Sequence, residues 1–264
     1  MDANSPILLF DSGVGGLTVY SAMRALLPDA PVIYAADLAG LPYGTKSEAE
    51  IAARVAGLLG RMSERYQPRL VCIACNTAST IALSMVRDAL EVPIVGTVPA
   101  IKPAAAMTKT GVIGLLGTAA TVRQAYVDNL ETEFAADKRL LRYAATGLVS
   151  AAEAKLRGRP VDASAVDTAV NALRSMENGE QIDTVVLACT HFPLLVEELA
   201  HGFGPEVQFV DGSAGIARRI AHLTQGQAFD ANTPSMAITT GDLDEFRLLG
   251  PTFEQHGISR LERF

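Results

Sequence analysis

The sequence is poor in cysteine, and it has no long apolar run. Its three cysteines among 264 residues are too few, and odd in number, for a disulfide framework. No stretch approaches the roughly 20 apolar residues that a membrane span needs. The first six residues (MDANSP) have neither the basic region nor the apolar core of a secretory signal. We therefore expect a cytoplasmic protein with reduced thiols and no membrane partner.

Positive charge is also scarce. Lys and Arg number 22 against 29 Asp and Glu, which gives a formal net charge of −7. This balance disfavours nucleic acid or an anionic membrane surface as the main partner.

The sequence lacks the motifs of common cofactors. The five lysines lie in no recognisable cofactor motif, and the sequence shows no flavin or metal motif. We therefore predict a protein that uses neither a cofactor nor a metal.

Short apolar runs alternate with longer helical patterns along the chain. This alternation is typical of repeated βα units around a parallel sheet. Several of the runs are apolar throughout, as expected for strands that are covered on both faces. The predicted strands are 7–10, 32–35, 70–74, 94–96, 112–116, 184–188 and 207–210, and the predicted helices are 48–65, 78–89, 122–134, 163–176 and 194–200.

One arrangement occurs twice in the chain. Residues 69–77 and residues 183–191 each contain a predicted strand that ends in Ala-Cys and is followed by polar residues. An earlier strand with a small polar turn precedes each of them. The sequence therefore predicts an α/β fold of two similar domains with mainly parallel sheets. The first domain comprises 1–97 plus 210–264, and the second comprises 98–209.

The repeated motif places Cys75 and Cys189 where strands end and helices begin. Ligands bind at the carboxyl ends of strands in open α/β sheets, so we expect the two thiols to share a cleft between the domains. Helix N-terminal N–H groups favour a thiolate there. The alternative is that both are small buried side chains, since free cysteine is commonly buried.

Other interpretations use the same atoms. Cys72 and Cys75 fit a C-x-x-C redox pair, but a three-residue step along a strand points side chains to opposite faces. A zinc site would add Cys189 and His191 to these thiols, and its Cys-x-His spacing is unusually tight. The glycine-rich segment 11–17 lacks the lysine of a P-loop and the third glycine of a dinucleotide motif. Its N–H groups suit a small anion, unless it is only a tight turn.

Several polar side chains are candidates for supporting roles. Asp11, at the end of a strand, is a candidate proton relay or amine ligand. His191 is a candidate relay or orienting cation. Glu153 is either a second relay or a solvated helix residue. Tyr43 follows a Pro-containing turn and either covers a ligand or packs in the core.

Together these segments resemble the glutamate racemases, within the cofactor-independent aspartate/glutamate racemases. The matching pieces occur in family order and cover most of the chain; they are 11–17, Asp37 with 41–44, 74–79, 117–123 and 188–195. The resemblance implies a pseudo-two-fold pair of α/β domains with the active site between them. It also implies that the protein is a homodimer that interconverts L- and D-glutamate. The D-glutamate would be used for bacterial peptidoglycan, which maintains cell shape.

The resemblance further implies roles for individual residues. Cys75 and Cys189 match two catalytic thiols on opposite faces of the α-carbon, and Asp11 and His191 match residues that assist them. Asp37 and Glu153 match accessory acids, although residues 144–147 lack the Cys-Pro pair that often precedes the second acid. The positions that match a substrate lining are Asp11, Ser12, Pro42, Tyr43, Gly44, Asn76, Thr77, Thr118, Thr121, Thr190 and His191.

The chemistry explains why two thiols are needed. Without a cofactor, N–H and hydroxyl donors must stabilise the charge that develops on the substrate carboxylate. Inversion requires a base on one face and an acid on the other, and a thiolate and a thiol can exchange these roles. Three alternatives remain: an aspartate racemase, which usually has Glu where this chain has His191; a related decarboxylase or isomerase; and a metal- or thiol-sensing module.

Overall fold

The computed structural model describes residues 2–264 and confirms the predicted α/β fold class. The chain divides into two compact units. One unit runs up to Thr97 and resumes at Ser213–Phe264, and the other is Val98–Gly212. All ladder pairings in both units are parallel. No helix within residues 2–264 combines the length and the apolar character needed to cross a membrane.

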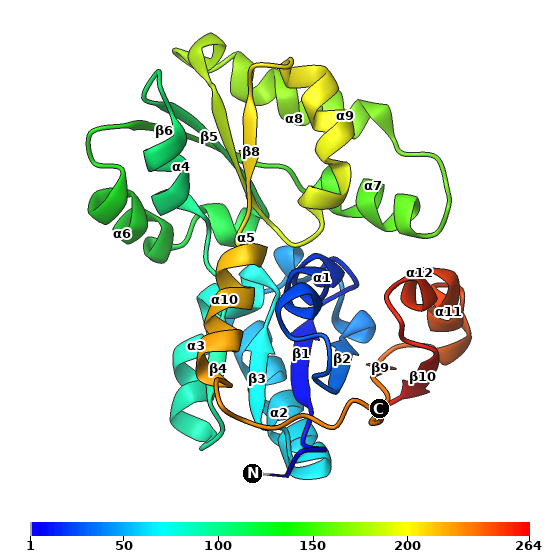
Figure 1. Cartoon of the computed structure of the whole chain (residues 1–264). Helices are drawn as coiled ribbons and strands as arrows, with labels where there is room; N and C mark the ends of the chain where they lie inside the picture. The colour runs from blue at the N-terminus through cyan, green and yellow to red at the C-terminus, as the bar shows by residue number, and fades with distance from the viewer. Residues whose placement is uncertain (1) are drawn as a thin grey trace. The chain divides into compact units, whose positions relative to one another are not determined.

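The first unit is built on a six-stranded sheet in the order β10-β9-β2-β1-β3-β4 (Figure 1). Every residue of β1, β2 and β3 is buried, which explains why these strands are continuous apolar runs. The strands are β1 (Ile7–Asp11), β2 (Val32–Ala36), β3 (Leu70–Ile73), β4 (Ile94–Gly96), β9 (Met236–Thr239) and β10 (Arg260–Arg263). The helices are α1 (Leu17–Leu26), η1 (Leu38–Gly40), η2 (Tyr43–Thr45), α2 (Glu48–Tyr66), α3 (Asn76–Ala89), α10 (Ser213–Leu223), α11 (Leu243–Arg247) and α12 (Gly250–Gln255).

The second unit is built on a four-stranded sheet in the order β6-β5-β7-β8. Its strands are β5 (Val112–Gly117), β6 (Arg139–Ala144), β7 (Thr184–Ala188) and β8 (Gln208–Val210). Its helices are α4 (Ile101–Met107), α5 (Ala119–Val122), α6 (Ala125–Phe134), α7 (Gly147–Leu156), α8 (Ala163–Arg174), η3 (Gly179–Gln181), η4 (Phe192–Leu195) and α9 (Val196–Phe203). Two apolar clusters cover the faces of this sheet, one of them formed with α7, α8 and α9.

Each predicted strand and helix corresponds to an element of the structure, but the structure also contains elements that were not predicted. All seven predicted strands are present to within a residue, but β6, β9 and β10 were not predicted. The sheet edges β6 and β10 carry arginines at exposed or partly exposed positions, so they lack the apolar run that marks the buried strands. The predicted helix 122–134 corresponds to α6, which ends at Phe134 as predicted but begins at Ala125, after the separate short helix α5.

A capping box fixes the start of α2. Ser47 is its N-cap, and its hydroxyl accepts from the backbone N–H of Glu50 while the Glu50 carboxylate accepts from the backbone N–H of Ser47. This reciprocal capping box satisfies donors that the first helical turn would otherwise leave unpaired. It also fixes the end of the loop that carries Tyr43.

The strand order of both sheets creates the same kind of site. The chain leaves β1 toward β2 on one side and leaves β3 toward β4 on the other, so the connections diverge between β1 and β3. Such a switch point opens a crevice at the carboxyl ends of the strands. β5 and β7 form the same switch point in the second sheet, between β6 and β8. The two units are therefore similarly built, as the repeated sequence motif predicted.

The end of the second unit differs slightly from the sequence-based boundary. β8 pairs with β7, with Val186 opposite Val210, so a boundary at 209/210 would cut through a strand. We therefore propose that the second domain extends through β8 to Gly212.

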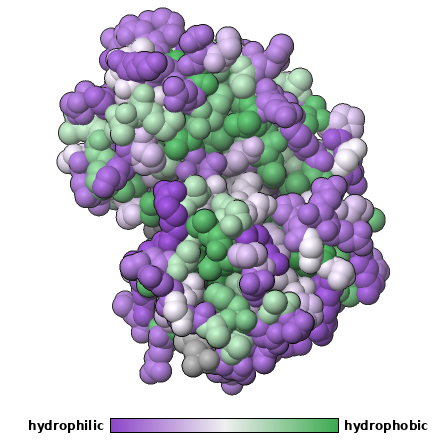
Figure 2. Space-filling model, in the orientation of Figure 1, coloured by the Kyte–Doolittle hydropathy of each residue, from purple (hydrophilic) through white to green (hydrophobic). Residues whose placement is uncertain are grey.

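The surface is mainly polar where Figure 2 displays it, with apolar side chains interspersed. Within residues 2–264, the exposed large apolar side chains are 36–55% exposed and far apart in the sequence; they are Leu26, Met85, Val98, Tyr126 and Leu248.

Candidate active site

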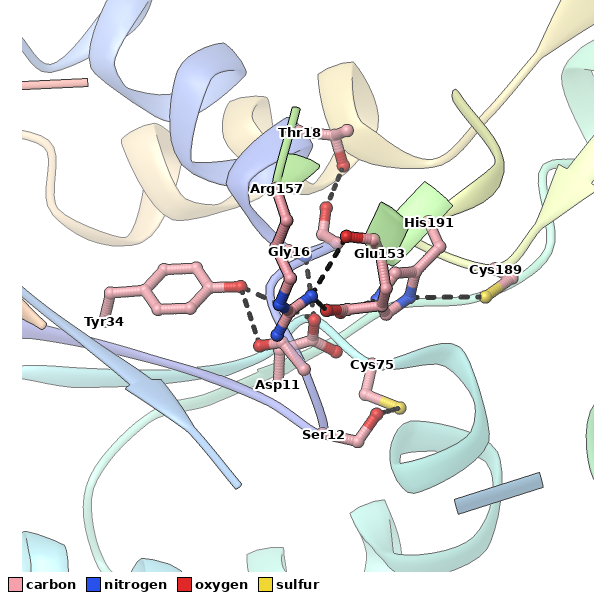
Figure 3. A network of polar contacts seen from close by, with 12 residues as sticks. Asp11, Ser12, Gly16, Thr18, Tyr34, Cys75, Glu153, Arg157, Cys189 and His191 are labelled. Atoms are coloured by element: carbon pink, nitrogen blue, oxygen red, sulfur yellow. Dashed lines mark hydrogen bonds and ion pairs between the residues drawn. The ribbon is translucent and has the colours of Figure 1, made fainter. Parts of the chain in front are cut away.

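Cys75 lies at the switch point of the first sheet, immediately before α3. It is the N-cap of this 14-residue helix, and its Sγ accepts from the backbone N–H of Ala78 at 3.5 Å. The pairing of Phe10 with Ile73 brings Ser12 opposite Cys75, and Ser12 Oγ lies 3.4 Å from the sulfur (Figure 3). The thiol is 5% exposed. The helix N-terminus and the hydroxyl therefore provide donors that favour a thiolate at this position.

Asp11 ends β1 and is fully buried. Its Oδ2 accepts from the backbone N–H of Gly16 at 2.8 Å and from Tyr34 Oη at 3.5 Å (Figure 3). A Cβ at Gly16 would lie 2.9 Å from Tyr34 Oη and 3.1 Å from Asp11 Cβ. Glycine is therefore needed here for close backbone approach to the carboxylate, which is fixed in orientation by these donors.

Asp37 is fully buried and accepts four hydrogen bonds. Oδ2 accepts from Arg54 Nε and Tyr43 Oη, both at 2.5 Å, while Oδ1 accepts from Arg54 Nη2 at 2.6 Å and from Thr240 Oγ1. Burial alone would raise the pKa of Asp37, but the bonds from Arg54, Thr240 and Tyr43 outweigh it and lower the pKa. The carboxylate therefore stays ionised and ties Tyr43 to α2 and to the end of β9.

We expect Arg54→Met to destabilise the first unit by about 2 kcal/mol, because it leaves a buried carboxylate without its cation. The value is below that of a fully buried pair because the Arg54 side chain is 35% exposed. Urea unfolding followed by far-ultraviolet circular dichroism measures this change. The matched control is Arg61→Met on the same helix, where the guanidinium lies over the Phe264 ring. Equal losses in the two variants would contradict the anchoring role of Arg54.

Cys189 follows β7 at the switch point of the second sheet. The expectation of a helix N-terminus here is wrong, because the residues after the thiol form the 3-10 helix η4, with His191 as its N-cap and Pro193 in its first turn. The main support for a Cys189 thiolate is instead the imidazole, whose Nδ1 lies 3.9 Å from Sγ. Cys189 is 7% exposed and His191 is 2% exposed.

His191 belongs to a chain of polar contacts that ends at Arg157 (Figure 3). Its Nε2 lies 2.7 Å from Glu153 Oε1, and Arg157 Nη1 donates to Glu153 Oε2 and, at 3.0 Å, to the Glu153 main-chain carbonyl. Glu153 is therefore buried against His191 and is not a solvated helix residue. The sequence alone did not distinguish a buried role for Glu153 from a solvated position on the helix.

The charges in this chain shift two pKa values in opposite directions. Burial opposes the charged form of His191, but hydrogen bonds and charge from Cys189 and Glu153 outweigh it and raise the pKa well above the usual value. Burial likewise opposes ionised Glu153, yet His191 and Arg157 lower its pKa to about 2. Around neutral pH, the groups next to Cys189 therefore include the His191 imidazolium and the Glu153 carboxylate.

The remaining predicted lining residues belong to one unit or the other. In the first unit, Asn76 and Thr77 form the first turn of α3 and are buried, whereas Pro42 is exposed and Gly44 is partly buried. In the second unit, Thr118 caps α5 by accepting from the N–H of Thr121, and Thr190 is 6% exposed. The pairing of Gly117 with Ala188 places Thr118 and Cys189 at the same edge of the sheet.

Cys72 is a core residue, which agrees with the expectation that it points to the opposite face from Cys75. It lies inside β3 opposite Leu9 with no exposed surface, and burial raises the pKa of its thiol to about 12. The cysteines of the described chain are all free thiols. Within residues 2–264 there is no group of three or more His, Cys, Asp or Glu side chains that could hold a metal ion.

Four residues that contact the candidate site residues were not predicted from the sequence. Tyr34 donates to Asp11, Arg54 and Thr240 donate to Asp37, and Arg157 donates to Glu153. Only Arg157 has a local sequence signal, because it follows Glu153 by four residues on a helix. The other three come from parts of the chain that only folding brings to these carboxylates.

The fold is α/β, and the switch point of each sheet holds one buried cysteine with polar neighbours. Comparison with known proteins identifies the family of this chain. The family model for Asp/Glu/hydantoin racemases matches residues 16–220, and the chain belongs to this family. It is an amino-acid racemase, and the relatives that it resembles are glutamate racemases.

The similarity extends over most of the chain. The glutamate racemase of Sphingopyxis alaskensis is 64% identical over 238 residues, which is 90% of this chain and 89% of that protein. The Escherichia coli K12 enzyme is 43% identical and covers 97% of this chain and 90% of its own length. The solved structure of E. coli glutamate racemase with L-glutamate and the activator UDP-MurNAc-Ala superposes with a TM-score of 0.91 at 41% identity, covering 98% of both chains.

Proposed function

We propose that the chain interconverts L- and D-glutamate by a two-base mechanism in which Cys75 and Cys189 act on opposite faces of the α-carbon. The observation that carries this proposal is the presence, at the switch point of each sheet, of one buried cysteine with its own polar support. The substrate follows from the relatives, which are named glutamate racemases, and from the E. coli structure that contains L-glutamate.

The two thiols would be stabilised by different means. The Cys75 thiolate is favoured by the α3 N-terminus and by Ser12. The Cys189 thiolate is favoured by the His191 imidazolium, which Glu153 holds in its charged form. We assign proton removal from L-glutamate to Cys189 and from D-glutamate to Cys75, following the family correspondence. The opposite thiol then supplies the returning proton, so each turnover exchanges the roles of the two groups.

The charge that develops on the substrate carboxylate needs fixed donors. We propose that Asn76 and Thr77, at the start of α3, and Thr118, Thr121 and Thr190 provide them. All five side chains are buried, so little water competes with the substrate for their hydrogen bonds.

We propose separate roles for the acids of the first unit. Asp11, fixed by the Gly16 N–H and Tyr34, assists Cys75 or binds the substrate amine. Asp37 anchors the loop that carries Tyr43 and Gly44, because its two oxygens are fully occupied by donors from Arg54, Tyr43 and Thr240. It is poorly suited to carry a proton.

The wider setting is also a proposal. The product D-glutamate would enter bacterial peptidoglycan, and we infer a cytoplasmic homodimer that needs no cofactor. Light scattering of the purified protein tests the dimer.

The catalytic proposal is tested by incubating the purified protein with L- and D-amino acids in heavy water. We expect deuterium at the α-carbon of glutamate together with inversion, and much slower reaction of aspartate, because His191 stands where aspartate racemases usually have Glu. Treatment with a chelator should leave the rate unchanged. Equal or faster turnover of aspartate would assign the chain to the sister activity, and zinc-restored activity after chelation would contradict a metal-free mechanism.

A further inference from the structure

We propose that Arg157 is a positioning residue for one half of the reaction, because it holds Glu153 in the orientation that supports His191 and, through it, Cys189. This inference rests on the proposed two-base function. It concerns a residue outside every matching motif of the sequence.

The contacts of Arg157 show how it would act. Its Nη1 donates to Glu153 Oε2 and to the Glu153 main-chain carbonyl, so it binds both the side chain and the main chain of the same residue. The other carboxylate oxygen, Oε1, is then directed to His191 Nε2 at 2.7 Å. The Arg157 side chain is 19% exposed and the Glu153 side chain 11% exposed, so solvent screens this pair only weakly.

The local backbone favours this contact. Arg157 is the C-cap residue of α7, one turn after Glu153, and the chain leaves the helix at Gly158, which has φ of +65°. A left-handed residue directly after the cap is a common way to end a helix and strongly favours glycine. The guanidinium is thereby fixed next to the carboxylate by four-residue helical spacing.

The physical effect of Arg157 is twofold. It limits rotation of the Glu153 carboxylate, and it keeps that carboxylate ionised, since an adjacent cation favours the charged form. Without Arg157, the carboxylate would be free to turn away from His191, and the imidazolium would lose part of its counter-charge. The supports of Cys75 are different groups, namely Ser12 and the α3 N-terminus. The loss should therefore fall on proton transfer at Cys189 alone.

Isotope effects can show that proton transfer at only one of the two cysteines is slowed, whereas the overall rates cannot. The equilibrium constant between two enantiomers is one, so any variant lowers kcat/KM equally in both directions. In Arg157→Met, however, removal of the α-proton by Cys189 becomes more rate-limiting. We expect the deuterium isotope effect on kcat/KM to rise for α-deuterated L-glutamate and to fall toward one for α-deuterated D-glutamate. General acid–base catalysis contributes about 10²–10⁴-fold, so partial loss of one support should lower kcat/KM about tenfold.

Two further variants make the test specific. Lys155→Met removes a cation from the same turn of α7, but Lys155 pairs with Glu198, at 2.7 Å, and not with Glu153; its isotope effects should equal those of the wild type. Arg157→Lys keeps the charge without the forked geometry, so it should restore part of the rate and move both isotope effects back toward wild-type values.

The outcomes separate this inference from the proposed function. Unchanged isotope effects in Arg157→Met and Arg157→Lys, whether the rate falls or not, would overturn the positioning role, because a merely structural residue lowers both steps alike. A wild-type protein that does not racemise glutamate would overturn the proposed function itself. Isotope effects that move in the reverse sense would support one-sided action of Arg157 and contradict the assignment of Cys189 to L-glutamate.

Discussion

Cys189→Ala is expected to abolish racemisation and to leave slow, configuration-retaining exchange of the α-proton of D-glutamate only. Without the Cys189 thiol nothing delivers a proton to that face of the α-carbon. Cys75 is still present, with the α3 N-terminus and Ser12 to support its thiolate. It can remove the proton from D-glutamate, exchange it with solvent and return it to the same face.

Cys75→Ala should give the mirror result, with exchange of L-glutamate only. Proton magnetic resonance in heavy water measures loss of the α-proton signal, and chiral chromatography measures inversion. We expect racemisation by either variant to fall by at least about 10³-fold, since each removes an essential acid or base and not only an orienting group.

Cys72→Ala is the matched control for both variants. Its thiol is buried inside β3, and burial keeps it protonated at neutral pH by raising its pKa to about 12. The substitution should lower stability slightly and leave racemisation intact. Near wild-type racemisation by either single active-site variant would exclude that cysteine as a base. Labelling of the same enantiomer by both variants would favour a single shared base.

The buried strands and the thiols were predictable from sequence because their evidence is local. Strands covered on both faces are unbroken apolar runs, and each of the two cysteines proposed as bases follows such a run. The edge strands β6 and β10 were missed because arginines interrupt their apolar pattern. The split between α5 and α6 was missed because the helical pattern continues across Arg123 and Gln124.

Other parts of the site depend on contacts that the sequence pattern does not encode. Asp37 was predicted only as an accessory acid, since its partner Thr240 lies 203 residues further along the chain. Tyr34 lies in β2 and reaches Asp11 only because β1 and β2 are neighbours in the sheet. Likewise, the two α/β motifs look alike in sequence, yet Cys75 caps an α-helix and Cys189 precedes a 3-10 helix. The two thiols are therefore supported by different groups.

Glu153→Gln is expected to destabilise the second unit by roughly 3 kcal/mol, with the largest loss between about pH 4.5 and 6.5. In the folded chain the pKa of Glu153 is lowered from 4.5 to about 2, and each pKa unit corresponds to about 1.4 kcal/mol. This contribution is fully present above the unfolded pKa and is lost as the pH falls toward 2. This stabilisation comes mainly from the contacts of Glu153 with His191 and Arg157. The pKa shift of His191 reflects the same contacts, so it adds no separate amount to the roughly 3 kcal/mol.

His191 limits the effect at higher pH. Its pKa is raised in the folded chain, so its contribution is fully present below the usual value of 6.5 and is lost as the pH rises through the folded value. Replacing the Glu153 carboxylate with an amide removes the main counter-charge of the imidazolium. The difference in unfolding free energy between wild type and variant should therefore be largest where both groups are charged in the folded and unfolded chains.

Urea unfolding at closely spaced pH values from 3 to 9 measures this difference. Glu198→Gln is the control, because it removes a carboxylate that pairs with Lys155 at a partly exposed position, where the side chain of Glu198 is 28% exposed. A surface pair of this kind contributes about 0–1 kcal/mol, so the control should show a small loss. A loss in Glu153→Gln that is equally small, or that does not diminish below pH 4, would show that the buried carboxylate does not hold His191 in its charged form.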